Sequence, residues 1–324
     1  MNAASEPLVS IVTPVYNEER HLGECIESVL AQTYSNWDYT IVDNCSTDGS
    51  AAIAERYASR DARIRVLRPK EFLKSFPNCN RAVRQISPAS KYCKVVLGDD
   101  WIFPECLARM VAVAEKHPSV GLVSAYALEG EQVVLSGLPY QTDFVLGREA
   151  CRKHLIERHY VFGTQTSVLY RADLVRSRDP FYDESNVHAD TEVCYAILKN
   201  SNFGFVHQVL TYTRVRPGSL NAQSLDLQTS WANIANLLSQ YGPDFLAQDE
   251  LERRHAQHLS DYYAFLGKSL LMKRDRTFWN YHTRELAKSR AGYSRARVFV
   301  GAVKTLAATA VNPARASRLL LGKG

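Results

Sequence analysis

The chain has 324 residues, of which 46% are hydrophobic and 23% are charged, and its formal net charge is +5. This composition is ordinary for a globular protein, and the length suits one large domain with an extension, or two domains. The excess positive charge is confined to the C-terminal end, because eight Lys and Arg but no Asp or Glu follow Glu285. This distribution excludes a nucleic-acid-binding surface spread over the fold, and we expect no nucleic-acid partner.

The seven cysteines are odd in number, form no CxxC motif and lie mostly within apolar patterns. These features argue against a disulfide framework or a zinc site and indicate reduced, buried thiols in a cytoplasmic protein. The polar N-terminal residues contain no signal-peptide core. We expect no membrane-spanning helix, because the nearest candidate, residues 298–311, is short and contains Lys304.

Strand and helix signals alternate over the first half of the chain, beginning with an apolar strand at 9–15 and an amphipathic helix at 19–32. The next strands are expected at 39–43, 63–67, 92–97 and 120–125, and the next helices at 49–58, 78–86 and 104–116. Alternation at this spacing predicts an α/β domain with a mostly parallel sheet and helices on both faces.

Two adjacent carboxylates, Asp99 and Asp100, follow the apolar strand at 92–97. Unpaired charge is costly to bury, so these side chains should face a ligand, a cation or solvent. Right-handed crossovers would bring residues 14–18, 43–48 and 98–101 to one edge of the sheet, where α/β proteins bind ligands. Because Mg²⁺ often bridges carboxylates to phosphates, we predict a phosphate-bearing substrate, with a solvated Asp-Asp turn as the alternative.

The second half of the chain is mixed and then wholly helical. A polar loop leads into a strand over 162–170, followed by a helix at 188–199 and a strand at 203–210. Helices are then expected at 225–241, 246–272, 276–288 and 295–309. Pro217 and Gly218 precede this change, so we predict a first domain over residues 1–222 and a helical C-terminal extension over 223–324.

Three segments at the predicted strand ends resemble family 2 glycosyltransferases: residues 10–19 (SIVTPVYNEE), 42–50 (VDNCSTDGS) and 98–100 (GDD). The resemblance covers about residues 7–220 and implies the GT-A fold, a Rossmann-like α/β domain that binds a nucleotide-diphosphate sugar. It implies an inverting transfer of a sugar, with a UDP-sugar as the expected donor, to a saccharide or lipid-linked acceptor. By family analogy, surface polysaccharide assembly is the expected setting.

The resemblance also assigns nucleotide-binding residues. Pro14 fixes the chain as it leaves the first strand, and Tyr16 offers a ring against which a nucleobase can lie. Glu18 would hold a ribose hydroxyl, and Asp43 would accept a hydrogen bond from an N–H of a base such as uracil. Asn80 would lie beside the base and ribose. For Glu18 a second interpretation stays open, namely negative charge at a helix N-terminus.

The metal and diphosphate motifs depart from the family pattern. Gly98 replaces the first acid of Asp-x-Asp, so Asp100 would coordinate Mn²⁺ or Mg²⁺ while Asp99 contacts ribose or cation-bound water. Arg216 stands where the family carries a His. Arginine cannot ligate a metal but binds phosphate bidentately, so we expect Arg216, with Arg214, to neutralise the leaving diphosphate. The dependence on a cation stays open, as does the alternative of two solvated arginines.

An inverting transfer needs a base that removes the proton of the attacking hydroxyl. The family places this acid in a Glu-Asp pair at a helix start, which resembles Ala189-Asp190 here. We therefore predict that Asp190 is the catalytic base. An N-cap role for Asp190 is the structural alternative. Glu192 is a weaker competitor, because helix geometry turns its side chain in another direction.

Residues 294–324 mix apolar and basic side chains without an acid. Such a segment either lies on an anionic membrane surface, as would suit a lipid-linked acceptor, or is a solvated tail. We expect a cytoplasmic protein, with the inner face of the cell membrane as a further location. The losses at Gly98, Ala189 and Arg216 leave a competing hypothesis, a catalytically degenerate nucleotide-sugar-binding module at the membrane. A sugar-activating nucleotidyltransferase is disfavoured, because residues 14–19 contain neither glycine nor a basic residue.

Overall fold

The computed structural model describes residues 6–288 and 292–311. These residues form two compact units, which divide between Pro217 and Gly218. We call them the sheet unit and the helical unit and describe each by itself. Residues 312–324, which include part of the stretch considered above for membrane contact, lie outside the described range.

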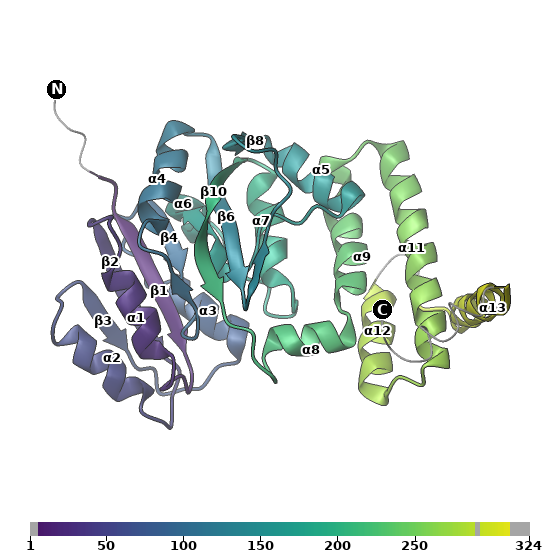
Figure 1. Cartoon of the computed structure of the whole chain (residues 1–324), viewed down its shortest axis with the longest axis horizontal. Coiled ribbons are helices and arrows are strands. Elements are labelled where there is room, and N and C mark those ends of the chain that lie inside the picture. The colour runs from purple at the N-terminus through teal and green to yellow at the C-terminus, as the bar shows by residue number, and fades with distance from the viewer. Residues whose placement is uncertain (1–5, 289–291, 312–324) are drawn as a thin grey trace. The chain divides into compact units, whose positions relative to one another are not determined.

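The sheet unit contains a ten-stranded sheet whose main path runs β3-β2-β1-β4-β9-β6-β10-β5 (Figure 1). Pairing is parallel among β1, β2, β3 and β4 and between β6 and β10, whereas β5, β7, β8 and β9 pair antiparallel. The strands are β1 Val9–Val15, β2 Trp37–Asp43, β3 Ile64–Leu67, β4 Tyr92–Val95, β5 Trp101–Ile102, β6 Val120–Glu129, β7 Gln132–Val134, β8 Phe144–Val145, β9 Leu169–Arg171 and β10 Asn202–Thr213. The predicted α/β fold is confirmed, with a mixed sheet rather than a mostly parallel one.

Helices accompany this sheet throughout the unit (Figure 1). They are α1 Leu22–Leu30, α2 Ser50–Ala58, α3 Ser75–Val83, α4 Cys106–Lys116, α5 Gly147–Glu157, α6 Ala172–Arg176 and α7 Ala189–Leu198, with a 3₁₀ turn at Gln165–Ser167. The apolar stripes of α1 and α4 pack with alternate residues of β1 and β2 in one buried cluster, which includes Ile26, Met110, Ile11 and Tyr39. This packing holds the parallel strands side by side and brings their carboxyl ends to one edge.

The sequence pattern located the regular elements of the sheet unit better than their ends. The strand predicted at 9–15 is β1 itself, whereas the helix predicted at 19–32 begins only at Leu22. The helix predicted at 78–86 spans Ser75–Val83. Its earlier start is compatible with Pro77, because a proline in the first helical turn removes no intrahelical hydrogen bond. The short strands β5, β7 and β8 and the helices α5 and α6 were not predicted. Strands of two or three residues carry too little periodicity to be read.

The helical unit comprises α8 Leu220–Leu227, α9 Ser230–Gln240, α10 Gly242–Phe245, α11 Gln248–Leu271, α12 Arg276–Lys288 and α13 Arg295–Val311. Its core is rich in aromatic side chains, among them Tyr262 and Phe278, which are fully buried. The single helix predicted over 225–241 is wrong. The chain leaves the helix at Gln228, which adopts a φ of 52°, and no glycine or proline marks this break in the sequence.

A glycine substitution tests the packing of the sheet unit. A β-carbon at Gly147 would overlap the backbone carbonyl oxygens of Ser201 and Leu198, which cannot retreat as a side chain could. We expect Gly147→Ala to lower the free energy of unfolding by about 1–3 kcal/mol. The control is Gly23→Ala in α1, where the nearest atom would be 3.9 Å away and alanine should be neutral or stabilise by up to about 1 kcal/mol. Urea unfolding of both variants makes the comparison, and equal stabilities would contradict this account of the packing.

Candidate active site

The loops after β1 and β2 are joined by hydrogen bonds. Asn17 adopts a φ of 55°, and its N–H donates to the Ser46 hydroxyl at 3.0 Å. The Asn17 side-chain oxygen accepts from the N–H of Thr47 at 2.8 Å, and the N–H of Glu18 donates to the Ser50 hydroxyl at 2.8 Å. Residues 17–21 therefore belong to this loop, which explains why α1 begins later than predicted.

The guanidinium of Arg216 joins the ends of β1 and β4. Its Nε lies 2.9 Å from Asp99 Oδ2, its Nη1 donates to Glu18 Oε2 at 3.0 Å, and its Nη2 pairs with Glu18 Oε1. Burial raises the pKa of Glu18 above its ordinary value, against the opposing effect of the Arg216 hydrogen bond. The structure thus brings Glu18, Asp99 and Arg216 into one group of ion pairs, the Arg216 cluster.

Asp100 lies beside the Arg216 cluster and is almost fully buried. Its Oδ1 accepts a hydrogen bond from the backbone N–H of Arg214 at 3.0 Å, and its Oδ2 accepts one from the Thr166 hydroxyl at 2.6 Å. Burial, reinforced by the charge of Asp99, raises the pKa of Asp100 to about 7. Thr166 is itself fixed, because its carbonyl accepts from the buried Nζ of Lys94 at 2.5 Å. Asp100 is therefore held firmly and is easily protonated for a carboxylate.

Arg214 is held by contacts of its own. Its Nη2 lies 2.5 Å from Glu24 Oε2, and its Nε donates to the carbonyl oxygen of Asp99 at 3.0 Å. The guanidinium carbon stands 5.3 Å from the ring centre of Trp101, which stacks on Tyr212 at 3.5 Å. The backbone of β10 and the chain after it therefore place both predicted arginines at the end of β4.

The predicted base-binding residues lie at the ends of β1 and β2. Pro14 is buried within β1, and the Tyr16 side chain beyond it is 45% exposed, with its ring centre 4.7 Å from that of Phe72. Asp43 ends β2 and is buried, and its Oδ2 lies 3.5 Å from the Nε of Arg68. An exposed aromatic pair thus stands at the same strand ends as a partnered carboxylate.

Asn80 lies on α3 with its amide group occupied by protein contacts. The side-chain nitrogen donates to the carbonyl oxygen of Tyr182 at 2.9 Å and to Glu184 Oε1 at 3.0 Å, and the side-chain oxygen accepts from the N–H of Tyr182 at 2.8 Å. The residue is 3% exposed. Its observed contacts tie α3 to the segment before α7.

Asp190 lies in the first turn of α7, where its Oδ1 accepts from the N–H of Thr191 at 2.8 Å. Burial raises the pKa of Asp190 to about 6. His188, not Asp190, occupies the N-cap position. Glu192 forms an ion pair of 2.8 Å with Arg178, as expected for a side chain directed away from Asp190.

The segment 160–167 connects the neighbourhood of Asp190 with that of Asp100. The Tyr160 hydroxyl lies 3.0 Å from Thr191 Oγ1, next to Asp190, and Thr166 in the same segment donates to Asp100. Among the contacts of the described residues, Asp190 makes no side-chain contact with the Arg216 cluster. The structure therefore gathers Glu18, Asp99, Asp100 and both arginines, while Asp190 stands one segment away.

A divalent cation is compatible with the donor set at this site. Asp99 and Asp100 offer hard carboxylate oxygens, the kind of ligand that Mg²⁺ and Mn²⁺ prefer. Within residues 6–288 and 292–311, no group of three or more His, Cys, Asp and Glu could hold a metal. A cation held here would therefore complete its coordination with water and with phosphate oxygens of a ligand, as is usual for Mg²⁺.

Three residues of this region were missed by the sequence analysis. Arg68 directly follows β3, so the topology that singled out the ends of β1, β2 and β4 could have found it. Thr166 was noticed only as part of a polar loop. Phe72 lies in an irregular segment with no periodic signal. Arg68 could thus have been predicted from the order of the strands. The positions of Thr166 and Phe72 depend instead on how their loops pack against the strand ends.

Comparison with known proteins agrees with this geometry. Residues 10–178 match the model of glycosyl transferase family 2. TuaG of Bacillus subtilis, named as a teichuronic acid biosynthesis glycosyltransferase, is 44% identical over 62 residues, which are 19% of this chain and 25% of TuaG. The chain likewise spans 40% or less of the length of the other leading curated relatives.

Solved structures show the same fold. TarS of S. aureus in complex with UDP-GlcNAc superimposes with a TM-score of 0.64 at 17% identity, covering 86% of this chain and 79% of TarS. The mannosyltransferase PcManGT of Pyrobaculum calidifontis, in complex with GDP-Man and Mn²⁺, gives a TM-score of 0.57 at 16% identity, covering 94% of this chain and 88% of that one.

Within the described residues, no helix is long and apolar enough to cross a membrane. The predicted resemblance and the GT-A-type fold are both confirmed. Since the family model spans more than half of the 324 residues, the chain belongs to glycosyl transferase family 2.

Proposed function

We propose that this protein is an inverting glycosyltransferase that moves a sugar from a nucleotide-diphosphate donor to a saccharide or lipid-linked acceptor. The observation that carries the proposal is the Arg216 cluster, where strand ends distant in the sequence meet around one guanidinium. Such a concentration of carboxylates and arginines at the carboxyl ends of parallel strands is suited to a charged nucleotide.

The nucleoside lies at the ends of β1 and β2 in this proposal. Tyr16, exposed beside Phe72, offers a face to the base, and Asp43 accepts an N–H at its Watson–Crick edge. Pro14 sets the backbone that leads to these groups, and Glu18 reaches a ribose hydroxyl. UDP is the proposed nucleotide. TarS, crystallised with UDP-GlcNAc, supports it, while the GDP-Man complex of PcManGT keeps a guanine nucleotide as the alternative to test.

Asp99 and Asn80 complete the proposed nucleotide site, Asp99 at the ribose and Asn80 behind it. The amide of Asn80 bonds to Tyr182, so its contribution is to fix α3 rather than to touch the ligand directly. Asp99 pairs with Arg216, and donor binding would transfer part of this guanidinium to a phosphate oxygen. The ribose hydroxyl then takes the place that Arg216 leaves on Asp99.

The diphosphate is neutralised by Arg216 and Arg214, and Asp100 would hold Mn²⁺ or Mg²⁺. A bound cation would add positive charge at the leaving group. Three nitrogens of Arg216 face carboxylates, which leaves two of its five N–H groups for phosphate oxygens. Arg216 can therefore contact the leaving group through these two N–H groups before its contact with Asp99 is exchanged.

Asp190 is the proposed base. The acceptor oxygen forms a bond to the anomeric carbon while the bond from that carbon to the diphosphate oxygen breaks, and the bonding electrons leave with the diphosphate. The acceptor proton passes to the Asp190 carboxylate. Attack opposite the leaving group inverts the anomeric carbon. A pKa raised to about 6 by burial makes Asp190 a stronger base than an exposed carboxylate, yet leaves it ionised at neutral pH.

The proposed setting is assembly of a surface polysaccharide at the cytoplasmic face of the membrane. The name of TuaG, a teichuronic acid biosynthesis glycosyltransferase, supports this setting. The substitutions at Gly98, Ala189 and Arg216 favour a second candidate, a nucleotide-sugar-binding module without transferase activity. The two candidates differ in turnover and not in donor binding.

A donor panel decides between them. We expect slow hydrolysis of one nucleotide sugar, or its transfer to an added saccharide, with UDP released and with higher rates in Mn²⁺ than in EDTA. The measurement is nucleotide release against UDP- and GDP-sugars, alongside calorimetric binding of each donor. Donor binding without turnover under every condition would favour the inactive module. The absence of both donor binding and turnover would refute both candidates.

Replacing Asp190 tests the base. We expect Asp190→Asn to lower kcat by roughly 10²–10⁴-fold with donor affinity unchanged, since the amide cannot accept the proton. In the unmodified protein, kcat/KM should fall as pH drops through about 6, because the base is then protonated. Glu192→Gln is the control and should retain the activity. A fully active Asp190→Asn variant would remove the assignment.

Replacing Arg216 tests the diphosphate contact. We expect Arg216→Ala to lower kcat/KM by roughly 10²–10³-fold, as the loss of a preorganised charge at the leaving group should. Affinity for UDP should fall as well, while affinity for uridine should stay nearly constant. The exposed Arg60 provides the matched arginine-to-alanine control. Equal losses of UDP and uridine binding would show that Arg216 acts on the fold instead.

A further inference from the structure

The helix α13 is fixed to α11 along one face by a close backbone contact. Gly301 and Gly267 lie at the crossing, where a β-carbon on Gly301 would overlap the carbonyl oxygen of Tyr263. Val298 and Ala302 on the same face are buried. Within the helical unit, these contacts fix which face of α13 packs against α11 and which face points away from it.

The opposite face of α13 is apolar and exposed. Phe299 is 65% exposed, Val303 47% and Leu306 54%, and these residues follow one another at spacings of four and three. Val300, 51% exposed, extends the same face. At 100° per residue, the four side chains occupy an arc of about 120°. We call them the α13 stripe.

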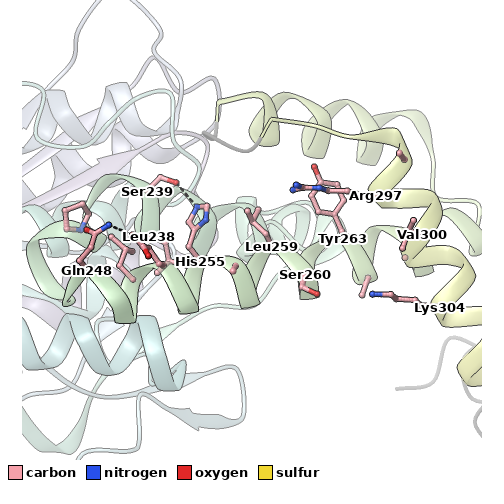
Figure 2. A pocket seen from close by; sticks show the side chains of 17 residues that line it. Leu238, Ser239, Gln248, His255, Leu259, Ser260, Tyr263, Arg297, Val300 and Lys304 are labelled. Carbon is pink, nitrogen blue, oxygen red and sulfur yellow. Dashed lines mark hydrogen bonds between the residues drawn. The ribbon is translucent and has the colours of Figure 1, made fainter.

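Basic side chains border the stripe on both sides. On the helical wheel Arg297 and Lys304, seven residues apart, follow one border, and Arg295 lies on the other. Figure 2 shows Arg297, Val300 and Lys304 on the α13 wall of a groove of about 850 Å³, opposite Leu259 and Tyr263 of α11. No Asp or Glu occurs between Glu285 and the C-terminus, so α13 brings no acid to this surface.

We propose that the α13 stripe is a docking surface for an anionic lipid bilayer. An exposed apolar arc bordered by Arg and Lys is the pattern of helices that lie in the membrane interface, with apolar side chains among the acyl chains and cations at the headgroups. Seventeen residues of α13 span about 25 Å at 1.5 Å per residue. The charge complementarity selects anionic lipid over a neutral bilayer, and it selects lipid over a second copy of this basic helix.

Vesicle flotation tests the surface with the full chain. We expect binding to vesicles of phosphatidylcholine with 30% phosphatidylglycerol, at least tenfold weaker binding to phosphatidylcholine alone, and release as salt is raised. The double variant Phe299→Glu/Val303→Glu should lose at least tenfold in binding. Leu225→Glu, at a residue 67% exposed on α8, is the matched control and should bind as the unmodified protein does. All these residues are exposed, so melting temperatures should stay close together.

Arg297→Gln/Lys304→Gln separates the charge from the apolar contact. This variant should bind anionic vesicles more weakly and with a shallower dependence on salt. Equal binding to neutral and anionic vesicles would overturn the proposal, as would full binding by the Phe299→Glu/Val303→Glu variant. Light scattering that shows a dimer dissociated by this variant, without vesicle binding, would identify the stripe as a contact between copies and would also overturn it.

The inference does not depend on the proposed reaction. None of the proposed donor, metal or base residues lies in α13, so loss of vesicle binding should leave donor hydrolysis unchanged. Failure of the flotation experiment would therefore leave the proposed function in place, and an inactive protein could still bind the vesicles.

Discussion

The site depends on a balance of charge at the ends of β1 and β4. Burial, together with the charge of Asp99, raises the pKa values of both Glu18 and Asp100, and the sheet would not hold three such carboxylates together unaided. Arg216 supplies the compensating charge by pairing with two of them, and the backbone after β10 supplies a hydrogen bond to the third. A segment more than a hundred residues away in the sequence therefore completes the end of β4.

Rigid packing and adjustable contacts are divided between different residues. Asp100 is held by Thr166, and Thr166 by the buried ammonium of Lys94, so this chain of contacts links β4 to the loop that follows it. The Arg216 side chain, by comparison, is 39% exposed, and its pairs with Glu18 and Asp99 can be exchanged for a ligand. A buried acid of fixed position and a more accessible arginine suit the proposed function, in which the site would bind a charged donor and then release a charged product.

The sequence predicted the parallel half of the fold because hydrophobic periodicity and the crossover connections between parallel strands follow simple rules there. Apolar runs set β1, β2 and β4, and right-handed crossovers made Glu18, Asp43 and Asp100 neighbours along one edge. The strand predicted at the end of 162–170 is β9, but the same rules could not foresee its antiparallel position between β4 and β6. Nor could they foresee the partnership of Tyr16 with Phe72 or the break at Gln228, because each depends on tertiary contacts without a local signal.

Gly98 gives the site a further property. A β-carbon at Gly98 would lie 3.4 Å from Glu18 Cγ, an ordinary van der Waals distance, and the resemblance described above implies an acid at this position. By the same resemblance, the loss of that acid and the presence of Arg216 in place of a histidine both make the site more positive. The proposed donor site is thereby less negative than the family pattern implies. An incoming polyanion would therefore meet less repulsion there before any cation binds.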